Sequence, residues 1–173
     1  QAAIETDART LAAAGAIVVD VALPARYAGL LAAQGLVAQR ENAVSFADEW
    51  MRSGDKLRRA LYDRCIDGLR ISGEDYQRAI ALGRECRARL GEVFGDCDVL
   101  IAPGATGEAP LGLESTGDPS MNQVWTYLHV PLVGVRAGTG PSGLPLGAQV
   151  VGRLDEDART LAAAHWIHQR LTG

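Results

Sequence analysis

Ser53 and Lys56 are the pair of side chains whose types and spacing could perform nucleophilic chemistry in this sequence. In an S-x-x-K motif, one helical turn places the lysine amine beside the serine hydroxyl. Here Gly54 lies between the two, in the segment RSGD at 52–55, which predicts a break between helices. The companion K-T-G motif is excluded, because Lys56 is the only lysine in the chain. We therefore interpret this stretch as a turn.

Two other patterns could bind ligands. The glycine-rich stretch GTGPSGLPLG at 138–147 could cradle a phosphate with its backbone amides, but it leads into a strand and lacks G-K-[ST]. His165 and His168 are three residues apart and could share a helix face, but no nearby carboxylate or cysteine completes a set of metal ligands. We therefore predict no catalytic residue, no metal site and no cofactor within this chain.

The composition restricts the class of protein. The chain has 173 residues, a formal net charge of −4 and 47% hydrophobic residues, which is typical of a globular protein and argues against nucleic acid as a partner. No apolar run approaches the roughly 18 residues of a membrane-spanning helix. The N-terminal residues lack the pattern of a signal peptide, and the three scattered cysteines fit reduced thiols. We expect a cytoplasmic protein that does not bind a membrane.

Hydrophobic periodicity predicts helices that alternate with strands. Strands are expected at 16–24, 98–102, 132–135 and 146–152, and helices at 2–14, 25–51, 57–69, 72–94, 118–128 and 157–171. In the helix over 25–51, the expected buried stripe includes Leu31 and Val44, and Ser72 is the expected N-cap of the helix over 72–94. The alternation predicts an α/β fold, in which a mixed β-sheet is covered by helices within a single domain over residues 1–173.

Four strands leave at least one edge of the predicted sheet unpaired. The first residue, Gln1, is not a methionine and falls at the start of a predicted helix. We therefore expect more sheet upstream of it. An exposed edge is also a surface through which the chain could form a homo-oligomer.

Three motifs follow one another in the second half of the chain. They are DVLIAPGATGEAPLG at 98–112, WTYLHVP at 125–131 and GLPLGAQVVG at 143–152. In this order and spacing they resemble the C-terminal part of amidase signature hydrolases. The helical stretches around Glu41-Asn42 and over 72–85 also fit that family.

The resemblance implies helices around a large mixed sheet, and hydrolysis of amide bonds by a Ser, cis-Ser, Lys triad. Such a triad needs a hydroxyl nucleophile, a neutral lysine that acts as base through the second serine, and backbone amides that stabilise the oxyanion. It would lie upstream of this chain, because no two serines are adjacent here and Lys56 lies in the wrong region.

The resemblance also implies a substrate pocket, with the loop after the strand at 98–102 on one side and Trp125 and Thr126 across from it. Trp125 fits the core of an amphipathic helix equally well. His129 stands where the family usually has glycine, and Arg136 where it usually has proline. A guanidinium at that position suits a carboxylate-bearing substrate or a surface salt bridge. The expected substrate-binding residues are Pro103, Gly104, Ala105, Thr106, Trp125, Thr126, His129 and Arg136.

The leading hypothesis is therefore a C-terminal portion of an amidase-family hydrolase that acts on carbon–nitrogen bonds. It would supply scaffold and pocket for a small-molecule amide substrate, together with the missing N-terminal half, and would not be catalytic alone. The alternative is a stand-alone, non-catalytic binding or assembly domain that retains the same scaffold. A penicillin-recognising serine enzyme is a third, weaker hypothesis, because it requires Ser53 and Lys56 to act as the S-x-x-K pair.

Overall fold

The computed structural model describes residues 2–172, and its contacts divide the chain into two compact units. One unit combines residues 1–24 with residues 89–173, and the other spans residues 25–88. Beside this division, the expectation of one domain over the whole chain stays a prediction. Within the described part, no helix has both the length and the apolar character needed to cross a bilayer.

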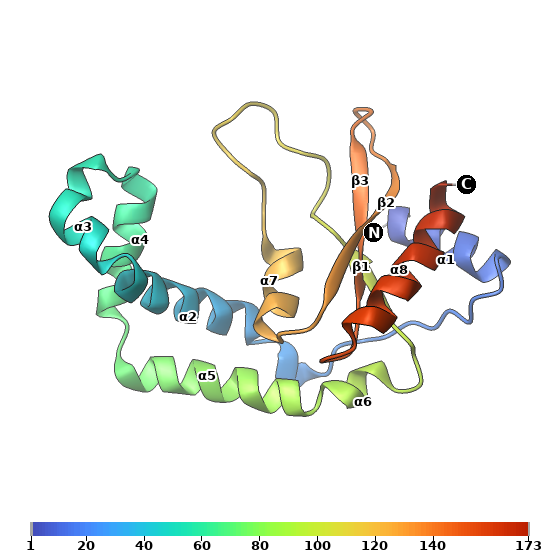
Figure 1. Cartoon of the computed structure of the whole chain (residues 1–173), viewed down its shortest axis with the longest axis horizontal. Helices are drawn as coiled ribbons and strands as arrows, with labels where there is room; N and C mark the ends of the chain where they lie inside the picture. Colours follow the sequence, from blue (N-terminus) through green and yellow to red (C-terminus); the bar gives the residue numbers. More distant parts are fainter. Residues whose placement is uncertain (1, 173) are drawn as a thin grey trace. The chain divides into compact units, whose positions relative to one another are not determined.

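A three-stranded sheet lies at the centre of the first unit (Figure 1). Its strands, with β3 between the other two, are β1 (Leu100–Pro103), β2 (Leu132–Thr139) and β3 (Pro145–Val151). Both pairings are antiparallel, and in the register Ala102 and Gly134 lie on either side of Gln149. The strands predicted in these three places are confirmed. The described sheet contains no parallel pair, because the fourth predicted strand does not join it.

The prediction of a buried strand over 16–24 is wrong. This segment is extended but forms no ladder with the described strands. Its large side chains are exposed, led by Ile17 at 95% and Val19 at 58%. β-Branched residues favour a strand when a neighbouring strand supplies hydrogen bonds and packing. The described part of the chain supplies neither here.

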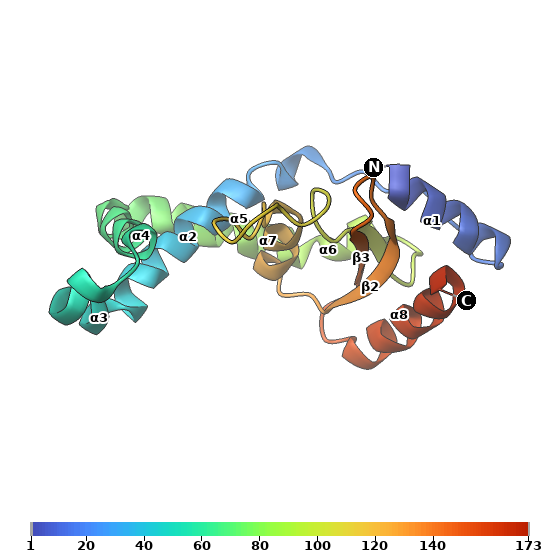
Figure 2. The ribbon, with the colours of Figure 1, turned by 90° about the horizontal axis from the view of Figure 1, so that it is seen from above.

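One face of the sheet packs against two helices, α1 (Ala2–Ala13) and α8 (Asp157–Thr172). Figures 1 and 2 show both helices on the same side of the strands. Val135, Val150 and Ile167 belong to the resulting core, which also includes Leu11 of α1. Burying each such side chain stabilises the unit by about 1.5–3 kcal/mol. As predicted, α1 ends near Gly15, whose φ of 97° suits a residue without Cβ.

Two short helices and a long loop complete the first unit. The helices are α6 (Leu90–Phe94) and α7 (Ser120–Tyr127), and the loop runs between β1 and α7. Asp118 was expected to cap a helix that starts with Pro119. Its carboxylate does accept the N–H of Ser120 at 2.8 Å, although the helix begins only at that residue. Figures 1 and 2 place α7 on the side of the sheet away from α8.

The second unit is helical. Its elements are a 3-10 turn (Ala25–Tyr27), α2 (Leu30–Ser45), α3 (Ala47–Ser53), a second 3-10 turn (Gly54–Lys56), α4 (Arg59–Arg70) and α5 (Gly73–Ala88). The helix predicted over 25–51 is divided at Phe46, whose ψ of 23° departs from helical geometry. α4 crosses α2 at Gly68, where a side chain would overlap the carbonyl of Gln39. The two helices approach closely because this position has no side chain.

Two details of the helical prediction have opposite outcomes. Leu31 and Val44 were expected in the buried stripe of α2, but they are exposed, and Ala33 and Ala43 are buried instead. The prediction favoured the larger side chains, whereas the close packing of α2 selects small ones. The N-cap prediction is confirmed, because the Ser72 hydroxyl accepts the N–H of the residue three positions later, at 3.0 Å.

Candidate substrate pocket

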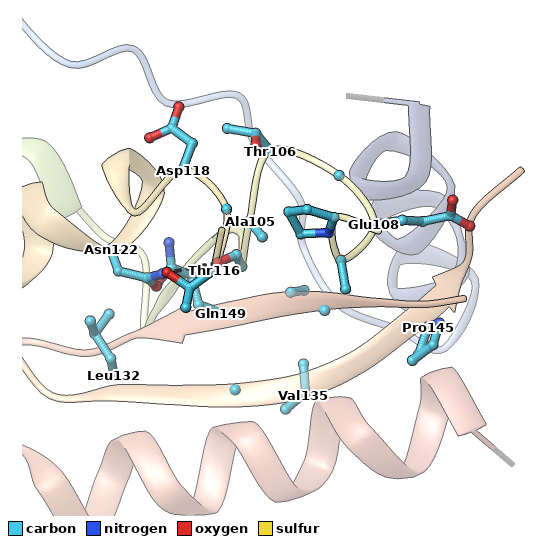
Figure 3. A pocket seen from close by; sticks show the side chains of 18 residues that line it. Ala105, Thr106, Glu108, Thr116, Asp118, Asn122, Leu132, Val135, Pro145 and Gln149 are labelled. Atoms are coloured by element: carbon cyan, nitrogen blue, oxygen red, sulfur yellow. Dashed lines mark hydrogen bonds between the residues drawn. The ribbon is translucent and has the colours of Figure 1, made fainter. Parts of the chain in front are cut away.

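A cavity of about 600 Å³ lies on the sheet face opposite α8 (Figure 3). Its walls come from loop residues 104–110 and 116–118 and from Asn122 of α7. Its floor comes from β2 and β3. We call this cavity the sheet hollow. It belongs entirely to the first unit.

Two glycines form much of the floor. Gly134 of β2 and Gly147 of β3 both line the sheet hollow. A Cβ atom added at Gly134 would meet no atom within 4 Å. Side chains alternate between the two faces of a strand, so the neighbouring Val135 belongs to the core on the other face. The hollow is therefore open where glycine replaces a side chain.

Gln149 is the most buried polar side chain of the hollow, with 3% of its surface exposed. Its Nε2 donates to the backbone carbonyls of Pro103 at 2.8 Å and Met121 at 2.7 Å. Because both partners can only accept, the orientation of the amide is fixed. Gln149 thereby ties β1 to α7. Its Oε1 is buried and has no hydrogen-bond partner among the described residues.

Glu108 closes the other end of the hollow. Its carboxylate accepts the backbone N–H groups of Ser142, at 2.9 Å, and Leu144, at 3.1 Å, in the turn between β2 and β3. Desolvation of the carboxylate acts to raise its pKa. Hydrogen bonds from the Ser142 hydroxyl and from the backbone of Leu144 and Ser142 outweigh that effect and lower the pKa below its ordinary value.

Relatives of this chain are found among known proteins. A glutamyl-tRNA(Gln) amidotransferase subunit from Hyphomonas neptunium is 31% identical over 180 residues, which cover 86% of this chain and 36% of that protein. Human fatty-acid amide hydrolase 2 is 32% identical over 61% of this chain and 20% of its own length. A solved structure described as an amidase superimposes with a TM-score of 0.87 and 25% identity, over 98% of this chain and 41% of that one.

Over the part that it spans, the chain belongs to the amidase signature family. A solved aryl acylamidase of that family shares the fold, with a TM-score of 0.72 at 22% identity, over 97% of this chain and 39% of that one. No protein-family model matches the chain. The chain spans about two fifths or less of the length of these amidase relatives. The predicted class, a partial amidase signature fold of helices and a sheet, is confirmed.

The structure brings some of the residues expected from the amidase resemblance together. Gly104, Ala105 and Thr106 line the sheet hollow. Pro103 ends β1 beside it, and its carbonyl accepts from Gln149. These four residues form one continuous wall, and their role toward a substrate stays a prediction.

The other four expected residues do not line the sheet hollow. Trp125 of α7 is 8% exposed and buried, whereas Thr126 on the same helix is exposed. Arg136 is exposed, and in the register it lies opposite Gly147, which does line the hollow. Their contribution to substrate binding also stays a prediction.

His129 has a local structural explanation. It follows α7 with a φ of 58°, in the left-handed region. Its N–H donates to the carbonyl of Thr126 at 3.1 Å, which closes the end of the helix. A glycine adopts this conformation without steric cost, so the usual glycine of the amidase pattern fits the backbone here. The unusual residue type at this position therefore does not by itself indicate a ligand contact.

The sequence analysis missed Glu108 and Gln149. Both fall inside the motifs that carry the amidase resemblance, where they had no assigned role. Glu108 is the only charged residue between Pro103 and Leu113, and Gln149 is the only polar side chain of β3. A lone polar group in an apolar or glycine-rich stretch needs a hydrogen-bond partner when it is buried. That signal could have identified both residues.

The lining of the hollow can bind but lacks a nucleophile and its base. Thr106 and Thr116 offer hydroxyl groups, Asn122 an amide, and Glu108 and Asp118 carboxylates. No serine, cysteine, histidine or lysine is among the described residues that line it. Ser53 and Lys56 belong to the other unit, where Ser53 ends α3 and Lys56 is exposed in a 3-10 turn.

Proposed function

We propose that this chain is the C-terminal, scaffold- and pocket-forming portion of an amide hydrolase, whose nucleophile and base lie outside it. The observation that carries the proposal is the sheet hollow, which has hydrogen-bonding groups but no nucleophile and base among its described lining residues. Membership of the amidase signature family supports the reaction class. The substrate would be a small molecule with an amide bond, held partly by Pro103–Thr106. The location would be the cytoplasm.

Hydrolysis would then depend on a second polypeptide segment. We expect the purified 173-residue chain to show no turnover of simple aliphatic or aryl amides. Supplying the upstream segment, either fused before Gln1 or as a separate chain, is expected to produce turnover. Turnover by the chain alone that disappears in Ser53→Ala or Lys56→Ala would overturn the proposal. An unchanged lack of turnover in both variants is the matching control.

An exposed apolar surface supports a second candidate, an assembly domain. In the described sheet, β1 and β2 each pair on one side only. The extended segment over 16–24 also exposes five large apolar side chains: Ile17, Val18, Val19, Val21 and Leu23. In the leading proposal, the rest of the hydrolase covers these surfaces. In the alternative, a second copy of the chain pairs with a sheet edge.

Size-exclusion chromatography with light scattering separates the two candidates. The leading proposal predicts concentration-dependent aggregation of the isolated chain, relieved by the upstream segment. A stable dimer, or a monomer that stays dispersed at every concentration, would favour the stand-alone domain.

A further inference from the structure

The wall of the sheet hollow is anchored at two points. At the first, the N–H of Gly104 donates to the carbonyl of Gly147 at 2.8 Å, and the side-chain amide of Asn122 donates to the carbonyl of Gly104 at 3.1 Å. At the second, the Glu108 carboxylate accepts from the N–H groups of Ser142 and Leu144. The wall over 104–108 is therefore stretched between β3 and the β2–β3 turn.

The loop beyond Glu108 has far less support. Leu111 and Leu113 are fully exposed. Close to them the chain makes a local hydrogen bond, from the N–H of Gly117 to the Ser115 hydroxyl. Chain that is exposed and makes few contacts opens at low free-energy cost. Any order in the wall must therefore come from its two anchors.

We propose that Glu108 is a positioning residue, whose carboxylate clasps the pocket loop to the β2–β3 turn and so holds the wall of the sheet hollow in place. Figure 3 shows its side chain directed away from the hollow toward this turn. Hydrogen bonds from backbone N–H groups to a carboxylate are stronger than those between neutral groups. Only the role of the wall in substrate binding rests on the proposed function, because the clasp itself requires no catalysis.

The charge environment makes the clasp depend on one group. Residues 140–144 of the turn contain no titratable side chain, β3 contains none, and β2 contains only Arg136. The other carboxyl groups of the same loop are Glu114 and Asp118. The lowered pKa of Glu108 means that the clasp is complete above the ordinary pKa of a glutamate, about 4.3. It is lost as the pH falls through the lowered value.

Gly140 provides an independent way to break the clasp. A Cβ atom at this position would overlap the Glu108 carboxylate and its Cγ. Gly140 does not have a positive φ, so alanine fits its backbone. Gly138 is a matched control, because a Cβ atom there would meet nothing within 4 Å. For charge, Glu114 in the same loop is the control for Glu108.

The first test is amide hydrogen exchange, measured residue by residue on the full 173-residue chain. We expect Glu108→Gln and Gly140→Ala to accelerate exchange at Ser142 and Leu144 by roughly tenfold or more, since each loses hydrogen bonds to a charged acceptor. Exchange should also rise over 105–108. Glu114→Gln and Gly138→Ala should leave these rates unchanged, and Val150 should stay protected in all four variants. Unchanged rates at Ser142 and Leu144 in Glu108→Gln would overturn the proposal.

The second test is a pH titration of the Ser142 and Leu144 amide chemical shifts. In the wild-type chain both should move together, with a midpoint below about 4.3, because both N–H groups bind the same carboxylate. The transition should disappear in Glu108→Gln and persist in Glu114→Gln. A transition that persists in Glu108→Gln would contradict the clasp. A confirmed clasp in a chain that never yields turnover with the upstream segment would disprove only the proposed function.

Discussion

The two faces of β3 show how one strand can serve both a core and a pocket. Val150 points to the face covered by α1 and α8 and is fully buried. Its neighbours Gln149 and Gly147 belong to the opposite face, where they line the sheet hollow. The first face is stabilised by apolar packing, and the second is shaped by missing side chains and by fixed hydrogen bonds. Substitutions on the two faces should therefore fail in different ways.

The largest effect is expected on the packed face. Ile167→Ala removes a side chain of α8 that is 4% exposed and contacts the sheet core. The cavity left behind should lower the free energy of unfolding by about 2–5 kcal/mol, measured by urea denaturation. Leu161→Ala on the same helix is the control, because that side chain is 59% exposed. Equal losses in the two variants would show that this face is not the core.

Gln149→Met tests the open face. The substitution keeps the side-chain length but leaves the carbonyls of Pro103 and Met121 without their donor. We expect a loss of about 1–3 kcal/mol in the free energy of unfolding, the cost of leaving buried polar groups unsatisfied. Gln169→Met, at an exposed position of α8, is the control. A neutral effect at Gln149 would mean that the tie between β1 and α7 is replaced by water.

Two glycines sharpen the same comparison within the hollow. A Cβ atom at Gly104 would lie 3.0 Å from the carbonyl oxygen of Gly147, whereas one at Gly134 would meet nothing within 4 Å. Gly104→Ala should therefore cost about 1 kcal/mol, and Gly134→Ala should change stability by less than about 0.5 kcal/mol. Thermal unfolding of both variants checks the order. The reverse order would place the open space elsewhere.

The smallest effects concern two carboxyl groups whose pKa values shift in opposite directions. Burial raises the pKa of Asp7 in α1, so its charged form destabilises the fold as the pH rises above about 3.9. Hydrogen bonds lower the pKa of Glu108, whose contribution is lost as the pH falls. At pH 7, Asp7→Asn should therefore be more stable than wild type and Glu108→Gln less stable. Denaturation curves at about pH 7 and about pH 3.5 should show both differences shrinking at the lower pH.

The sequence predicted most elements because local signals agree with the structure. The apolar runs at β1 and β3 and the hydroxyl of Ser72 all act within a few residues of their own position. The segment over 16–24 carries the same kind of apolar run, yet it remains unpaired among the described residues. A run of β-branched residues reports the tendency to form a strand, whereas the partner strand is a non-local property.

The site was predicted in part for a related reason. The family motifs located the wall over 103–106, which follows a recognisable strand. They gave no role to Glu108 or Gln149, because the partners of these side chains are backbone groups at least 28 residues away. Backbone donors and acceptors are present at every residue, so no residue type marks them in the sequence.

The bare segment over 16–24 also affects the fate of the polypeptide before it meets any partner. Its apolar side chains are interrupted by one charge, Asp20, which is exposed. Charges within such runs act as gatekeepers that slow the stacking of strands into fibrils. A single carboxylate therefore separates this stretch from an amyloid-forming sequence, and its loss would shorten the time for which newly made chains can wait for a partner.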